Sequence, residues 1–162
     1  MLFRQSMDED RLLLLKAIKI AAKGIDKGCG PFGAVIAKNG MILAETVNRV
    51  TLDSDPTAHA EVAAIRKAAE ALKTHNLEGC TLYSSCEPCP MCLGAIYWAG
   101  ISRVVYACNR HDAAKAGFSD KDIYDEIILD PVERRIAFKH IADMDGEEAF
   151  RVWEDYENKM PY

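Results

Sequence analysis

The chain has 162 residues, of which 49% are hydrophobic and 28% are charged. These proportions are typical of a soluble globular protein and exclude a disordered, fibrous or collagen-like chain. The 20 Lys plus Arg residues against 25 Asp plus Glu give a formal net charge of -5, which argues against broad affinity for nucleic acid and favours a small-molecule partner.

Neither a membrane span nor a secretory signal is expected. The longest apolar block, residues 12–15, is far shorter than the ~18 apolar residues of a transmembrane helix. The first ten residues carry acidic side chains where a signal peptide would place its apolar stretch. We therefore expect a cytoplasmic protein without a membrane partner.

The length fits one domain, and no repeat, low-complexity tract or linker divides residues 1–162. The first part of the chain begins with apolar residues at helical spacing, which predict a helix over residues 8–26. Two strands, 32–37 and 41–48, are then joined by the dipeptide Asn39-Gly40, which is typical of a β-hairpin turn.

The middle of the chain alternates between the two kinds of element. We predict helices over residues 59–73 and 91–99, and strands over residues 80–85 and 104–107. This alternation indicates a three-layer α/β/α domain in which the later strands run parallel.

The last third of the chain has a weaker pattern. Short helices are expected near residues 112–116 and 121–128, a fifth strand over residues 136–141, and a final helix over residues 147–159. The fold class is therefore α/β with five strands.

Two short motifs carry the chemistry: His59-Ala60-Glu61 and Pro88-Cys89-Pro90-Met91-Cys92. In a chain of this composition a His-x-acid triplet is expected by chance about 0.6 times, but Pro-Cys-x-x-Cys only about 0.008 times. The second motif is therefore the specific one, and both are predicted to lie at the start of a helix.

The cysteine motif predicts a metal site. Two thiolates separated by two residues at a helix start converge on one ion, and His59 supplies a third ligand of the kind zinc prefers. Glu61 can reach the same site only if both residues lie in the first turn, because residues two apart on a helix point in nearly opposite directions. Glu61 would then move protons beside a zinc-activated water.

One structural alternative remains open at this stage. Cys86 could join the three ligands in a closed Cys₃His site that only stabilises the fold. The cysteines at positions 29, 80 and 108 are expected to be packed thiols without a role. Phe32, Trp98 and Trp153 are by default expected in the core.

Several longer stretches resemble known enzymes. Residues 30–35, 55–61 and 86–96 resemble the cytidine deaminase superfamily, whose signature is His-x-Glu followed by Pro-Cys-x-x-Cys. Residues 97–99, 111–114 and 116–118 resemble its bacterial guanine deaminase branch. The similarity extends from about residue 17 to residue 162.

The resemblance implies a fold and a reaction. The implied fold is a cytidine deaminase-like α/β/α domain with a mixed five-stranded sheet between helices. The implied reaction is hydrolytic deamination of guanine, in which a zinc-activated water attacks C2 and xanthine and ammonia leave. One zinc ion per chain is the implied cofactor, and a small purine base is the implied partner.

The resemblance also implies residue roles. His59, Cys89 and Cys92 are implied as zinc ligands, and Glu61 as the acid/base. Asp120 would hold the departing amino group, Phe32 would stack on the purine and Asn48 would bind its imidazole side. Further substrate contacts are implied at Ala60, Trp98 and Tyr162.

The same resemblance implies a homodimer. Guanine deaminases of this branch exchange C-terminal segments, so residues 131–162 of one chain would close the pocket of the other. Phe150, Trp153 and Tyr156 recur three residues apart in that segment, which indicates one aromatic helix face.

Two rival functions compete with this interpretation. A tRNA adenosine deaminase would share both motif blocks, but the acidic net charge argues against a protein that grips an RNA loop. A non-catalytic zinc-stapled module would use the closed four-ligand site.

Overall fold

The computed structural model describes residues 7–161, and the chain divides into two compact units that meet between Lys121 and Asp122. The elements in chain order are α1 (Met7–Ile25), β1 (Gly30–Lys38), β2 (Met41–Asn48), α2 (Val50–Asp53), α3 (Ala60–Leu72), β3 (Thr81–Cys86), α4 (Pro90–Trp98), β4 (Arg103–Cys108), α5 (Arg110–Lys115), α6 (Asp120–Ile127), a 3-10 turn (Pro131–Glu133) and α7 (Glu148–Asp155).

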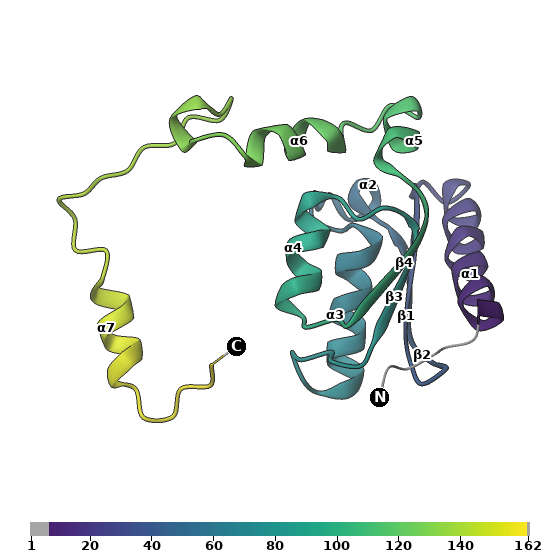
Figure 1. The fold of residues 1–162 in the computed structure, drawn as a ribbon, viewed down its shortest axis with the longest axis horizontal. Helices are drawn as coiled ribbons and strands as arrows, with labels where there is room; N and C mark the ends of the chain where they lie inside the picture. The colour runs from purple at the N-terminus through teal and green to yellow at the C-terminus, as the bar shows by residue number, and fades with distance from the viewer. Residues whose placement is uncertain (1–6, 162) are drawn as a thin grey trace. The chain divides into compact units, whose positions relative to one another are not determined.

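The first unit is built on a four-stranded mixed sheet of order β2-β1-β3-β4. β1 pairs antiparallel with both β2 and β3, whereas β3 and β4 run parallel. Helix α1 covers one face of this sheet, and α3 and α4 cover the other (Figure 1). The predicted three-layer α/β/α architecture and the parallel pairing of the later strands are thus confirmed.

The central strands are buried on both faces, because each face is covered by a helix. Along β1, Val35 packs with Leu13 of α1, whereas its neighbour Ile36 packs with Ala64 of α3. Successive side chains of a strand point to opposite faces, so one apolar run supplies both cores. This double burial explains why the middle of β1 reads as a continuous apolar stretch.

Most element boundaries confirm the expectations from the sequence to within two residues, including α1, the hairpin and the series from α3 to β4. The extra short helix α2 occupies the connection between the hairpin and α3. None of the helices in residues 7–161 combines the length and hydropathy needed to cross a bilayer.

The expected fifth strand is wrong. Residues 136–141 form no strand, and the sheet of the described chain has four strands. In this segment Arg134 stacks over the ring of Phe138 at 4.9 Å, and Arg135 pairs with Glu126. Alternating apolar residues make a strand only where a sheet edge is available to pair with, and the second unit contains no other strand among its described residues.

The expectation that both tryptophans lie in the core is also wrong. Trp98, the last residue of α4, is 71% exposed, and Trp153 of α7 is 41% exposed. Both residues sit on short helices, whose apolar side chains cannot all face one neighbour. Phe32, in contrast, is partly buried and packs against the core on the α3 side.

The close approach of α1 to β1 depends on one glycine. A methyl group at Gly33 would lie 2.3 Å from the backbone oxygen of Ala17 and 2.9 Å from the nitrogen of Ala21. Gly94 of α4 has open space around the same position. These two glycines therefore make a matched pair.

We predict that Gly33→Ala lowers the free energy of unfolding by about 1–3 kcal/mol, because α1 must move away from the sheet. Gly94→Ala should raise it by about 0.5–1 kcal/mol, because alanine favours a helix. Urea unfolding at one protein concentration measures both. Equal effects of the two substitutions would contradict the close packing at Gly33.

Candidate active site

Three side chains converge where helices α3 and α4 begin. His59 is the N-cap residue of α3, Cys89 is the N-cap residue of α4, and Cys92 lies in the first turn of α4. The two sulfurs are 3.6 Å apart, and each lies 3.5 Å from Nδ1 of His59. Among the described residues, these three form the group whose ligand atoms are close enough to hold a metal ion.

The shape of this triangle fits zinc. A tetrahedral zinc ion, with bonds of about 2.3 Å to sulfur and about 2.0 Å to nitrogen, holds two sulfurs about 3.8 Å apart and sulfur and nitrogen about 3.5 Å apart. The observed separations lie within about 0.2 Å of these values. The chain therefore already presents three ligand atoms at zinc-binding distances.

The local sequence explains why both helices begin at the site. His59 and Cys89 have extended backbone angles, and Pro90 occupies the first turn of α4, where its missing N–H is not needed. The hydroxyl of Thr46 in β2 donates to the backbone oxygen of Ala60 at 2.6 Å, which ties the start of α3 to the sheet. Both positive helix ends thus face the same point and favour thiolates there.

The pKa values of the two cysteines shift in opposite directions. A hydrogen bond from Cys92, and then one from His59, lowers the pKa of Cys89, whereas the bond to Cys89 and burial raise the pKa of Cys92. The same contact with Cys89 raises the pKa of His59. Because both thiols must be deprotonated to bind metal, the site holds a metal ion more weakly as the pH falls.

Glu61 is a buried carboxyl group beside these ligands. Its side chain is 4% exposed, with Oε1 accepting a hydrogen bond from Ser84 at 3.0 Å and Oε2 lying 3.5 Å from the sulfur of Cys92. Burial raises the pKa of Glu61, and bonds from its own backbone and from Ser84 oppose that shift. A carboxyl group with a raised pKa next to a metal site is suited to accept and return protons.

A pocket of about 460 Å³ opens onto His59, Cys89 and Glu61. It is lined by side chains from β1, β2, the loops before α4 and α6, and the starts of α2 and α3, among them Phe32, Asn48, Thr51, Glu87, Phe118 and Asp120. The size suits a small molecule.

Two aromatic rings form one wall of the pocket. Phe32 and Phe118 meet edge to face, with ring centroids 4.7 Å apart and an interplanar angle of 79°. This contact fixes the orientation of Phe32, since edge-to-face pairs have a defined geometry. A flat heterocyclic ring could stack on such a wall.

The amide of Asn48 has a defined orientation. Its Oδ1 accepts a hydrogen bond from the backbone nitrogen of Val50 at 3.2 Å, so the NH₂ group is the end left to act as a donor to a ligand. A methyl group at Gly30 would come within 2.8 Å of that Oδ1. The absence of a side chain at Gly30 therefore leaves room for the Asn48 amide beside the pocket.

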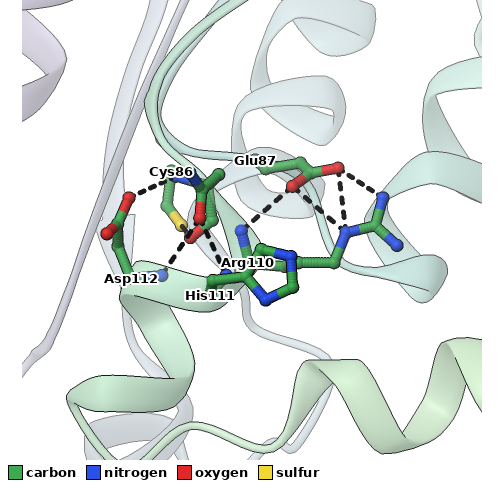
Figure 2. A network of polar contacts seen from close by, with 6 residues as sticks. Cys86, Glu87, Arg110, His111 and Asp112 are labelled. Atoms are coloured by element: carbon green, nitrogen blue, oxygen red, sulfur yellow. Dashed lines mark hydrogen bonds and ion pairs between the residues drawn. The ribbon is translucent and has the colours of Figure 1, made fainter.

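An ion pair holds the loop that carries the metal-binding cysteines. Figure 2 shows the carboxylate of Glu87 facing the guanidinium and backbone nitrogen of Arg110, with the nearest oxygen 2.6 Å from Nη2. The backbone nitrogen of Glu87 also donates to the oxygen of Cys108 at 2.8 Å. These bonds extend the β3–β4 pairing beyond the strand ends and tie the loop to α5. Phe118 lies three residues after the end of α5.

The other predicted site residues have different placements. Asp120 is partly buried at the pocket, where burial raises its pKa. The side chain of Ala60 is buried in the core, so it can offer a ligand only its backbone. Trp98 is exposed and is not among the pocket-lining residues of the described chain. Tyr162 lies outside the described residues.

The sequence had assigned no role to three residues that shape the pocket. Phe118 belongs to the stretch that carries the family resemblance, Glu87 lies between Cys86 and Cys89 in the loop, and Ser84 lies on the metal-facing side of β3. Strand alternation could have indicated Ser84, because Leu82, two residues earlier, faces α3. No sequence pattern marks the ring contact of Phe118.

Comparisons with known proteins agree with this geometry. Residues 7–108 match the family described as cytidine and deoxycytidylate deaminase zinc-binding region. The guanine deaminase of Bacillus subtilis is 51% identical over 92% of this chain and 96% of its own length. A crystal structure of guanine deaminase from that organism superimposes with a TM-score of 0.92 at 50% identity, covering 94% of this chain and 98% of that one. The tRNA-specific adenosine deaminase of B. subtilis is 44% identical over 62% of each chain.

We predict that Cys89→Ser and Cys92→Ser lose bound zinc, whereas Cys86→Ser keeps about one zinc ion per chain. The sulfur of Cys86 is directed to the backbone oxygen of Asn109 at 3.6 Å and does not belong to the ligand triangle. Metal analysis of the three purified variants measures the difference. Equal loss of zinc in all three would favour the closed four-ligand site.

Proposed function

Because this chain belongs to the family of zinc-binding cytidine and deoxycytidylate deaminases, we propose that it hydrolyses guanine to xanthine and ammonia. The observation that carries this proposal is the buried carboxyl of Glu61, which lies beside a zinc-shaped ligand triangle at a pocket with an aromatic wall. The similarity to a bacterial guanine deaminase over nearly the whole chain supports guanine as the base.

His59, Cys89 and Cys92 are the residues that would hold the metal. When bound, zinc supplies Lewis-acid chemistry and a water whose pKa is lowered to about 7. Glu61 would take up one proton of that water on Oε2, the oxygen that faces the ligands, and deliver it to a ring nitrogen of the base. The same carboxyl group would then carry the second proton of the water to the departing amine, so that ammonia leaves and the carbon–nitrogen bond at C2 is replaced by the carbonyl of xanthine.

The pocket residues orient the base for this transfer. Phe32 stacks on the purine, held by its contact with Phe118. The NH₂ group of Asn48 donates to an acceptor on the imidazole side of the base. Asp120 holds the amino group that leaves, and Ala60 contributes its backbone. A site built on matched hydrogen bonds rejects bases that leave its polar groups unpaired.

The rival activity on tRNA has less support. The relative that acts on tRNA matches a smaller share of the chain, and a net charge of -5 opposes binding of an RNA loop. We place the enzyme in the cytoplasm, a reducing compartment in which the thiol ligands stay available.

We further propose that the deaminase domain, residues 1–162, works as a homodimer with exchanged C-terminal segments. The segment 131–162 would cover the partner's pocket, with Tyr162 and Trp98 completing the substrate contacts. In its own unit, α7 exposes Phe150, Trp153 and Tyr156, and such an aromatic face is suited to docking on another surface. Closure by a tail would admit the base and then exclude water.

The proposed activity predicts a clear pattern of ammonia release. The zinc-loaded protein should release ammonia from guanine, and much less from guanosine, adenine, cytosine or an adenosine-containing tRNA loop. Glu61→Gln should reduce the rate about 10²–10⁴-fold and keep about one zinc ion per chain, because the residue transfers protons. Comparable turnover of guanine and guanosine would contradict an enclosed pocket, and preferential release from the tRNA loop would favour the rival.

The exchanged tail predicts a second result. Deleting residues 158–162 should lower turnover of guanine strongly while zinc content and dimerisation persist, because the metal ligands and α7 remain. Enzyme assays and analytical ultracentrifugation measure the three properties. A monomeric wild-type protein, or full turnover after the deletion, would refute the exchange without affecting the zinc chemistry.

A further inference from the structure

Two neighbouring serines of β3 make hydrogen bonds on opposite faces of the sheet. Ser84 and Ser85 are both buried, and each uses its hydroxyl group in one hydrogen bond to a distant part of the chain. Successive side chains of a strand point to opposite faces of the sheet. One serine is therefore directed toward α3 and the metal ligands, and the other toward the side covered by α1.

Ser84 contacts the proton-transferring carboxyl. Its hydroxyl donates to Oε1 of Glu61 at 3.0 Å, whereas Oε2 of the same carboxyl lies beside the sulfur of Cys92. The bond thus distinguishes the two oxygens and sets the rotation of the carboxyl about its last torsion, which is otherwise broad. Without the hydroxyl group, a buried oxygen would lose a partner and the carboxyl would be free to turn.

Ser85 contacts the strand that carries the aromatic wall. The β1–β2 ladder pairs Gly30 with Asn48 and then Gly33 with Val47, so that the residues between, Phe32 among them, form an irregularity. At its end the backbone nitrogen of Gly33 donates to Oγ of Ser85 at 3.0 Å, a buried bond. This bond secures the backbone directly after Phe32 at a point where regular pairing is interrupted.

We propose that Ser84 and Ser85 are both positioning residues with different targets. Ser84 orients the carboxyl group of Glu61 for proton transfer, and Ser85 holds the backbone that places Phe32 for base stacking. The proposal rests on the function proposed above. Its distinctive consequence is that two adjacent, chemically identical side chains control different kinetic constants.

Ser84→Ala should lower kcat for guanine about 10- to 100-fold and change KM less than about threefold, since the base still binds. Ser85→Ala should raise KM about 5- to 10-fold and change kcat less than about threefold, since loss of base stacking weakens binding. Ser84→Thr and Ser85→Thr keep the hydroxyl group and should recover most of the lost constant. All variants should keep about one zinc ion per chain.

Ser102 provides a matched control. Its hydroxyl accepts a hydrogen bond from the backbone nitrogen of Gly79 at 2.8 Å, at an exposed position outside the pocket. Ser102→Ala removes the same kind of bond as Ser85→Ala and should leave both kinetic constants unchanged. A purely structural effect of losing a buried hydroxyl would instead lower the unfolding midpoint and affect both constants alike.

Crystal structures of the variants give a readout that does not depend on turnover. In Ser84→Ala the carboxyl of Glu61 should occupy more than one rotamer, and in Ser85→Ala the backbone near Phe32 should shift while Glu61 stays in place. An unmoved Glu61 in the first variant, an unmoved Phe32 in the second, or the same kinetic profile in both would overturn the proposal. If the wild type fails to deaminate guanine, the proposed function fails, and the two structures still decide whether the serines position these groups.

Discussion

The site depends on one constraint: two helices must begin at the same point on the same face of one sheet. Helices α3 and α4 lie on the same side of β1 and β3, and their N-cap residues are His59 and Cys89. Because an N-cap residue has extended backbone angles, its side chain is released from the helical direction and can turn inward. The short spacing to Cys92 then completes the triangle. A change in the crossing of either helix would move a ligand atom by more than the few tenths of an ångström that zinc coordination tolerates.

Hydrogen bonds explain why a buried carboxyl group is tolerated beside two thiols. Burial opposes the charge on Glu61 and raises its pKa, and two hydrogen bonds reduce this effect. The carboxyl group of Glu61 therefore loses its proton less readily than an exposed carboxyl group does. Polar groups in such a site must be paired to be stable, and the described chain leaves no buried side-chain nitrogen or oxygen atom without a partner. The bonds that satisfy the fold are therefore also those that orient the reacting groups.

The sequence predicted most of the first unit, because its elements carry strong local signals. Apolar periodicity located α1, α3 and α4, and the turn at Asn39 and Gly40 located the hairpin. The rarity of the cysteine motif identified the ligands before any geometry was known. The predictions that failed depended on partners that a linear pattern cannot show. Residues 136–141 pair with no strand in the described part of the chain, and Trp98 is exposed although aromatic residues are commonly buried. The amide orientation of Asn48 likewise required the contact with the nitrogen of Val50.

Strand β3 links these observations, because its side chains make hydrogen bonds both to Glu61 and to the strand that carries Phe32. Its partners β1 and β4 carry the aromatic wall and the chain that leads to Phe118, and the loop after it carries Glu87 and Cys89. A one-residue shift of β3 would turn Ser84 and Ser85 to the opposite faces of the sheet and break both of their buried hydrogen bonds. Groups attached to such a strand are therefore held to a narrow range of positions, which is the requirement for proton transfer over hydrogen-bond distances. The flexibility that admission of a substrate demands must then come from segments outside the sheet.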